Sequence, residues 1–234
     1  MRIAAIIPAF NEEKSISSVV NEIILASSNS DYEIIPIVIN DCSTDRTEEV
    51  IKKLDCVAIH LPINLGIGGA VETGYKFALE NGFDYAVQVD GDGQHPPEFI
   101  PDMIHELKKN NLDVVIGSRY ISKQGFQSSF MRRMGINYFK NLNYFLTGMI
   151  ITDSTSGFRM LNKKALQLLS ENYPDEYPEP EAIILYCKFG LKTGEVSVKM
   201  KERQGGKSSI NAFSSVYYMI KVSIAVIFTR LRKR

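Results

Sequence analysis

The sequence predicts an α/β protein whose mostly parallel sheet is flanked by helices. Short apolar segments rich in β-branched residues alternate with amphipathic segments along the first half of the chain, as strands and crossover helices do. The chain has 234 residues, of which 44% are hydrophobic and 23% are charged. This length and composition suit one large domain with a sizeable core.

The first half predicts strands and helices in regular alternation. Apolar runs closed by proline, glycine or polar residues predict strands over 2–8, 33–39, 57–61, 85–89 and 113–116. Apolar residues at steps of three and four predict helices after Asn11, over 45–54, from the glycine-rich 64–70 to about 81, and over 97–109. Ser43 can cap the helix over 45–54 with its hydroxyl group.

The second half is less regular. We expect helices over 130–146, 162–169 and 182–189, and short strands over 155–161 and 195–200. Asn162 can cap the helix that follows it. A loop rich in proline and carboxylates, residues 173–181, precedes the helix over 182–189.

The C-terminal segment has an apolar stripe and a basic end. Its net charge from residue 199 onward is +8, with nine basic residues and one acidic, so the first 198 residues carry −8. Lys221 near the middle of the apolar stretch favours an interfacial helix over a membrane span. We therefore expect a domain over 1–209 and, over 210–234, an amphipathic helix on an anionic membrane surface; packing on the domain or on a partner subunit stays open. The stripe consists of Ile210, Phe213, Tyr217, Ile220, Ile224, Ile227 and Leu231.

The N-terminus and the cysteines indicate a cytoplasmic protein. The apolar run at residues 3–7 ends at Pro8, too early for a secretory signal. The three cysteines are far apart without a metal-binding or disulfide pattern, which fits a reducing compartment. We expect the protein to be peripheral to the cytoplasmic face of the membrane, with no nucleic-acid partner; a membrane-protein partner or a homo-oligomer remains possible.

The turn Asp90-Gly91-Asp92 follows the strand over 85–89. Gly91 lets the backbone bend tightly, so the carboxylates of Asp90 and Asp92 can face one ion, and Gln94 can add a carbonyl oxygen. Such ligands suit Mg²⁺ or Mn²⁺ that is also held by substrate phosphates. The same sequence is also an ordinary turn, whereas a calcium loop of the EF-hand type would need an acidic residue where Pro101 stands.

Seven short blocks occur in order along the chain, most of them where a predicted strand ends. Ligands of parallel sheets bind beyond these carboxyl ends. The blocks are Pro8-Ala9-Phe10-Asn11-Glu12, Asn40-Asp41-Cys42-Ser43-Thr44-Asp45, residues 64–70, Asp90-Gly91-Asp92, Gly117-Ser118-Arg119-Tyr120, Ser156-Gly157-Phe158-Arg159 and Arg203-Gln204-Gly205-Gly206-Lys207-Ser208. Over residues 3–209 the chain resembles family 2 glycosyltransferases of the GT-A fold, in particular the dolichyl- and polyprenyl-phosphate mannose or glucose synthase branch. The usual paired aspartates of this family read Asn40-Asp41 here.

The resemblance implies a role for one set of residues. A nucleotide-diphosphate sugar, with UDP or GDP, would bind Pro8, Phe10, Glu12, Ile39, Asp41, Asp90, Gly91, Asp92, Arg119, Arg203 and Lys207. Within this set Ile39 and Asp41 would contact the base, and Asp90, Asp92 and Gln94 would hold Mg²⁺ or Mn²⁺. Glu12 and Asp41 could instead cap helices, and Arg119 and Arg203 could be surface ion pairs.

The implied reaction is metal-dependent transfer of a sugar with inversion, to a polyprenyl phosphate in cell-envelope glycan synthesis. Asp92, Arg119 and Arg203 would stabilise the leaving diphosphate, and Asp153 would orient the acceptor or act as base, with Glu179 and Glu181 as further candidates. A sugar hydroxyl of a growing polysaccharide is the alternative acceptor, and it would need such a base. The predicted fold is also compatible with a sugar nucleotidyltransferase or a non-catalytic membrane-docked binding protein.

Overall fold

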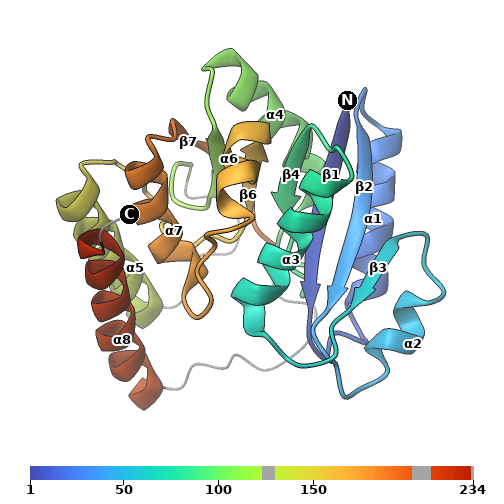
Figure 1. Cartoon of the computed structure of the whole chain (residues 1–234), viewed down its shortest axis with the longest axis horizontal. Coiled ribbons are helices and arrows are strands. Elements are labelled where there is room, and N and C mark those ends of the chain that lie inside the picture. Colours follow the sequence, from blue (N-terminus) through green and yellow to red (C-terminus); the bar gives the residue numbers. More distant parts are fainter. Residues whose placement is uncertain (123–129, 202–211, 233–234) are drawn as a thin grey trace.

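The computed structural model describes residues 1–122, 130–201 and 212–232, and these form a seven-stranded mixed sheet with helices on both faces (Figure 1). The strand order is β3-β2-β1-β4-β6-β5-β7. The pairs β3–β2, β2–β1, β1–β4 and β5–β7 are parallel, whereas β6 runs antiparallel to both β4 and β5. The predicted class is confirmed.

The strands are short and mostly buried. Central strand β1 is covered on both faces, because every residue after Arg2 in it is buried, as expected for a central parallel strand. The strands are β1 (Arg2–Ala9), β2 (Glu33–Asn40), β3 (Val57–His60), β4 (Tyr85–Gln88), β5 (Val114–Ser118), β6 (Arg159–Asn162) and β7 (Thr193–Ser197).

Two layers of helices enclose the sheet. One core packs α1 and α4 against one face, and the second packs α3, α6 and α7 against the other. A third, smaller cluster joins α5, α7 and α8 at the end of the molecule farthest from β3 (Figure 1). The helices are α1 (Ile16–Ser28), α2 (Thr47–Ile51), α3 (Gly66–Glu80), α4 (Ile100–Lys109, preceded by a 3-10 turn over Pro97–Phe99), α5 (Phe130–Thr147), α6 (Lys163–Leu169), α7 (Pro178–Phe189) and α8 (Ala212–Leu231).

Two predicted helix starts are wrong. Helix α2 begins at Thr47, whose amide donates to the Asp45 carboxylate at 2.9 Å. The predicted cap residue Ser43 accepts the Asn11 amide instead, at 3.0 Å. Helix α7 begins at Pro178, four residues before the predicted start, with proline in its first turn. The predicted Asn162 cap is confirmed, since the Asn162 side chain accepts the Ala165 amide.

Candidate functional site

A cavity of about 360 Å³ opens where β1, β2 and β4 end. The strand ends, the loop before α3 and the turn after β4 all contribute to its wall. Its lining residues are Pro8, Ala9, Phe10, Glu12, Asp41, Asn64, Gly66, Ile67, Ala70, Asp90, Gly91 and Asp92. Seven of the residues predicted to bind a nucleotide sugar therefore surround one cavity.

The loop after β1 provides an aromatic side chain and an acidic one. Phe10 is 47% exposed at the cavity, so its ring can stack against a planar base. The Glu12 amide donates to the Thr47 hydroxyl at 2.8 Å, and the Glu12 carboxylate accepts the Ser15 hydroxyl at 2.7 Å. Glu12 is thus held in place at the start of α1, in agreement with a role in supporting that helix.

Asn11 joins this loop to the loop after β2. Its backbone adopts the left-handed conformation, with φ of 58°, which asparagine tolerates better than most residues. Its side-chain oxygen accepts the Thr44 amide at 2.8 Å and the Asp45 amide at 3.3 Å. The two loops are therefore fixed to each other before any ligand binds.

Asp41 holds the start of α3 against the cavity. Its two carboxylate oxygens accept the Leu65 amide at 2.7 Å and the Gly66 amide at 2.9 Å. These amides lie at the N-terminus of a helix, where backbone donors need partners. Capping is therefore part of the role of Asp41, whether or not it also contacts a base.

Ile39 and Asn40 precede Asp41 on β2. Ile39 has no exposed surface and packs in the core that α3 covers, so in this structure its side chain offers no contact to a base. The Asn40 amide group lies 3.1 Å from His60 Nδ1, and its oxygen accepts the Ser43 amide. The Asn40 side chain thus joins the end of β2 to β3 and to the loop after β2.

Asp90 is oriented by two neighbours. Its carboxylate accepts Gln88 Nε2 at 3.0 Å, and its backbone amide donates to His95 Nδ1 at 3.0 Å. Because Nδ1 accepts, the proton of a neutral His95 lies on Nε2, which is 3.5 Å from an Asp90 carboxylate oxygen. His95 is 5% exposed and stacks on Phe158, so it supports the turn from the protein interior.

Asp92 and Gly91 form the centre of the turn. The Asp92 carboxylate accepts the Gln94 backbone amide at 3.0 Å, and a Cβ on Gly91 would stand 3.0 Å from the Pro8 carbonyl oxygen. The glycine therefore allows the turn to lie against the end of β1. Gln94 is half-buried, and its side chain does not line the cavity.

The donor set fits a hard divalent cation. Asp90 and Asp92 bring two carboxylates to one cavity, and carboxylate oxygens are ligands that Mg²⁺ and Mn²⁺ accept. Among the described residues no group of three or more histidine, cysteine or carboxylate side chains could hold an ion. A metal here would therefore take further ligands from water or from a bound diphosphate.

Arg119 and Asp153 form a buried ion pair. Arg119 Nε and Nη2 donate to the two oxygens of Asp153 at 2.7 Å each, and Nη2 also donates to the Thr155 hydroxyl. Although burial opposes its charge, the bonds to Asp153 raise the pKa of the Arg119 guanidinium. Arg119 is 8% exposed, so the alternative of a surface ion pair does not apply to it.

The geometry of Asp153 does not fit a general base. Asp153 has no exposed surface, and its two oxygens already accept the Arg119 fork. A base must reach the proton that it removes. We therefore correct the predicted role of base: Asp153 fixes the position of Arg119, and a part in orienting the acceptor stays a prediction. Sequence reasoning missed Glu195, whose carboxylate accepts the backbone amides of Thr152 and Asp153.

Glu179 and Glu181 lie in the first turn of α7. Desolvation raises the pKa of the Glu179 carboxyl, an effect that Arg159 opposes and Asp90 reinforces. Glu179 is half-buried, so part of it reaches solvent. Burial also raises the pKa of Glu181, whose carboxylate accepts the Thr229 hydroxyl of α8.

Arg203 and Lys207 lie outside the described residues. The last described residue before them is Lys201, and its backbone amide donates to the Gln94 carbonyl at 3.0 Å. The chain thus passes the turn after β4 two residues before Arg203. The roles of Arg203 and Lys207 stay predictions.

Residues 4–169 match the family model described as Glycosyl transferase family 2. The chain belongs to this family. It is thus a glycosyltransferase, and the resemblance to family 2 is confirmed.

Two curated relatives match most of the chain. A UDP-N-acetylglucosamine–dolichyl-phosphate N-acetylglucosaminyltransferase of Methanococcus voltae is 36% identical over 214 residues, 83% of each chain. An undecaprenyl-phosphate mannosyltransferase of Micrococcus luteus is 26% identical over 223 residues, 90% of this chain and 88% of its own. Both names specify a lipid phosphate.

Solved structures share the fold. Glucosyl-3-phosphoglycerate synthase from Mycobacterium tuberculosis, solved with Mn²⁺, UDP and glucosyl-3-phosphoglycerate, superposes with a TM-score of 0.70. The match covers 98% of this chain and 79% of that chain at 21% identity, so it shows the GT-A-like fold alone. Over the described residues, every helix is too short or too polar to cross a bilayer.

Proposed function

We propose that this glycosyltransferase moves a sugar from a nucleotide-diphosphate donor to a polyprenyl phosphate in cell-envelope glycan synthesis, with inversion. The observation that carries the proposal is the cavity at the strand ends, with Asp90 and Asp92 in its wall and Phe10 at its edge. The lipid phosphates in the names of both curated relatives support the acceptor.

The proposed reaction is a single displacement. An oxygen of the acceptor phosphate forms a bond to the anomeric carbon while the bond from that carbon to the donor diphosphate breaks, and the electron pair leaves on the nucleoside diphosphate. Attack opposite to the leaving group inverts the anomeric centre. A phosphate nucleophile is already anionic, so the step needs no general base.

The main catalytic task is to stabilise the leaving diphosphate. Mg²⁺ or Mn²⁺, held by Asp90 and Asp92 with further ligands from water or the diphosphate, would neutralise charge there; the predicted ligand Gln94 does not line the cavity. Arg119 does not line the cavity, but it is a preorganised cation that Asp153 fixes and whose charge interacts with Asp90, and we infer that Arg203 and Lys207 add to it. Phe10, Glu12 and Asp41 form the side of the cavity at which we place the nucleoside.

A lipid acceptor requires contact with a membrane. The stripe predicted for α8 is exposed at each of its described positions, and the exposed fraction runs from 39% at Ile227 to 71% at Leu231. Ile210 lies outside the described residues, and so does the side chain of Phe213. We infer that α8 lies peripherally on the cytoplasmic face of an anionic membrane.

Product analysis tests the proposal. Purified protein with Mn²⁺ or Mg²⁺ is incubated with UDP- and GDP-sugars, with and without undecaprenyl phosphate, and nucleotide release and lipid-linked sugar are measured. We expect both products only when lipid phosphate, metal and the correct donor are present. Nucleotide release with no lipid-linked sugar from any donor would refute the acceptor assignment.

Transfer to a sugar hydroxyl is the second candidate. Desolvation and the charge of Asp90 raise the pKa of Glu179, which favours this acceptor because a hydroxyl group needs a general base and a raised pKa makes a carboxylate a stronger one. A Glu179→Gln variant discriminates: it should keep full activity with a phosphate acceptor and lose activity with a hydroxyl acceptor.

A further inference from the structure

Helix α8 presents large apolar side chains to solvent. Its buried face is formed by Val222 and Val226, both with no exposed surface. On its outer face Ile220 is 56% exposed, Ile224 50% and Phe228 68%. A helix that only packs on its own domain would leave mainly polar side chains outside.

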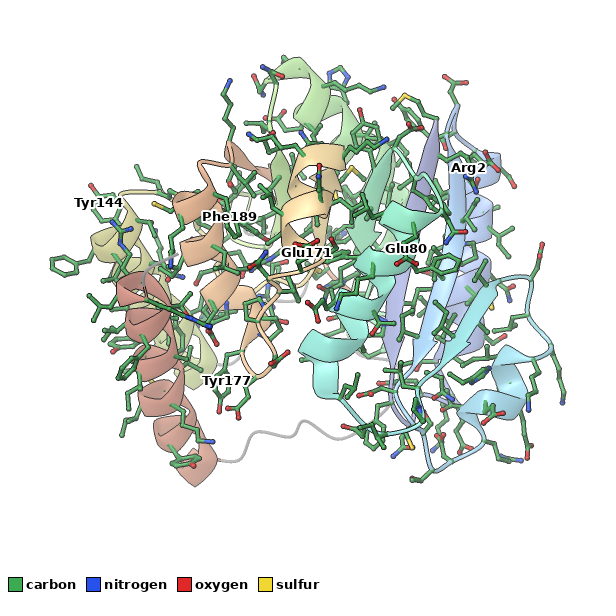
Figure 2. All side chains as sticks on the ribbon, viewed as in Figure 1. Arg2, Glu80, Tyr144, Glu171, Tyr177 and Phe189 are labelled. Atoms are coloured by element: carbon green, nitrogen blue, oxygen red, sulfur yellow. The ribbon has the colours of Figure 1, made fainter. Side chains whose placement is uncertain are left out.

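Helix α5 has a similar outer face, which the sequence pattern did not indicate. Met134 is 54% exposed, Tyr144 54% and Phe145 84%, and Ile150 just beyond the helix is 73% exposed. Tyr144 points away from the body of the molecule at the end occupied by α5 and α8 (Figure 2). Exposed apolar side chains on two neighbouring helices form a larger patch than the single exposed apolar residues that are normal on a protein surface.

The two helices pack against each other. Phe139 of α5 lies in one cluster with Val222 and Val226 of α8. At the surface, the Tyr138 hydroxyl lies 2.9 Å from the Ser223 hydroxyl, so a hydrogen bond joins the outer faces. We call these outer faces, with Ile150, the α5–α8 surface.

The charge on these segments has one sign. Residues 130–150 and 212–232 contain six basic residues and no aspartate or glutamate. Lys221 is paired with Glu176 across 3.8 Å, and the other five basic residues are Arg132, Arg133, Lys140, Arg230 and Arg232. An apolar surface with basic residues complements an anionic bilayer.

We propose that the α5–α8 surface is one docking surface for an anionic bilayer, and that α5 contributes to it as much as α8. This inference rests on the proposed function, since a polyprenyl phosphate is reached at a membrane, and it adds a second helix to the contact. A second copy of this chain fits less well, because basic residues would face basic residues across the interface. Helix α8 begins at the end of the molecule towards which β1 and β2 point (Figure 1).

Vesicle binding of full-length protein tests the proposal. The variants are Phe145→Ser on α5 and Phe228→Ser on α8, with Leu25→Ser on α1 as control, because Leu25 is 60% exposed on a helix away from α5 and α8. Sedimentation is measured with mixed phosphatidylcholine–phosphatidylglycerol vesicles and with phosphatidylcholine vesicles. We expect Phe145→Ser and Phe228→Ser each to weaken binding to the mixed vesicles about tenfold, as for withdrawing one phenyl group from an apolar medium, and Leu25→Ser to bind as wild type.

Two outcomes would overturn the proposal. Loss of binding in Phe228→Ser with wild-type binding in Phe145→Ser would leave α8 as the only contact. A stable dimer in light scattering that Phe145→Ser converts to monomer would make a second copy the occupant. Transfer to a short-chain, water-soluble polyprenyl phosphate needs no membrane, so its rate should be the same in Phe145→Ser and in wild type. If wild-type protein does not transfer sugar to this acceptor, the proposed function is refuted, whereas the vesicle-binding result still stands.

Discussion

Single carboxylates at the ends of the strands serve both the local fold and the cavity. Asp41 accepts two amides that begin α3, and Asp92 accepts an amide of its own turn, while both line the cavity. Residue types and spacing predicted that these side chains gather at one place. The sequence could not predict that Ile39 is enclosed in the core or that Asp153 forms an ion pair with Arg119, because both depend on packing between distant segments.

Asp92→Asn should lower transfer by more than about a hundredfold, the scale for losing one electrostatic stabiliser of a leaving group. The substitution removes an anionic metal ligand while keeping the side-chain size. Turnover with saturating Mn²⁺ is compared with that of Asp31→Asn, an exposed loop residue, which should be normal. Near-normal turnover of folded Asp92→Asn would refute the metal assignment.

Asp41→Asn should raise KM for the donor with little change in kcat, because its contacts are the same in the ground and transition states. The asparagine amide would face one of the two backbone amides that Asp41 now accepts. We therefore also expect a loss of about 1–2 kcal/mol in the free energy of unfolding. Steady-state kinetics and urea unfolding measure the two effects; a fall in kcat at constant KM would contradict the placement of the nucleoside.

At the scale of elements, the accuracy of prediction depended on where the deciding contacts lie. Helices α4 and α5 each end within one residue of the predicted C-terminal end, because their own apolar periodicity defines them. The start of α2 was mispredicted because Asn11, more than 30 residues away, binds the Thr44 and Asp45 amides and keeps these residues in the loop. The partners of Arg159 were unpredictable for the same reason: its motif was recognised, but the Glu179 carbonyl and the Tyr186 hydroxyl that it binds come from α7.

Arg159→Lys should destabilise the fold by about 3 kcal/mol, the scale for leaving buried acceptors without donors. Its guanidinium has no exposed surface and donates to the carbonyls of Ser154, Ser156 and Glu179 and to the Tyr186 hydroxyl. It thus joins the loop before β6 to the start of α7, and a lysine ammonium cannot span these partners. Urea unfolding measures the loss; stability within about 0.5 kcal/mol of wild type, the scatter of surface substitutions, would contradict this role.

Asp113 should make stability depend on acid pH. Although burial opposes its charge, bonds from Lys164, the Lys192 amide and Asn162 lower the pKa of Asp113. Because the folded pKa is below the unfolded one, the stabilisation is present above the unfolded pKa of about 4 and is lost as pH falls through the folded pKa. Asp113→Asn should therefore be less stable than wild type at neutral pH, and the difference should shrink on acidification; a constant difference in urea unfolding across this range would contradict the linkage.

At the scale of the whole molecule, the sequence pattern predicted a boundary between the domain and the C-terminal helix at residue 209, whereas α8 packs against the domain. Val222 and Val226 are fully buried against α5 and α7, Thr229 donates to Glu181, and Lys188 donates to the carbonyls of Thr229 and Arg232 at the end of α8. The apolar and basic pattern predicted one face of this helix, but the partners of its other face come from segments distant in sequence.

A chain that ends at Ser209 should therefore keep the nucleotide cavity and lose stability. Removal of α8 uncovers Phe139 and Ile184 and deletes two buried valines, and full burial of each valine is worth about 1.5–3 kcal/mol. We expect a clearly lower Tm, with the Kd for UDP or GDP within about threefold of that of the full chain because the cavity lies at the ends of β1, β2 and β4. Val226→Ala in the full chain removes part of the same packing, and its Tm should lie between those of the full chain and the truncated chain. An unchanged Tm on truncation would show that 210–234 is an independent appendage, as the sequence division implies, whereas loss of nucleotide binding would show that α8 supports the site through α7.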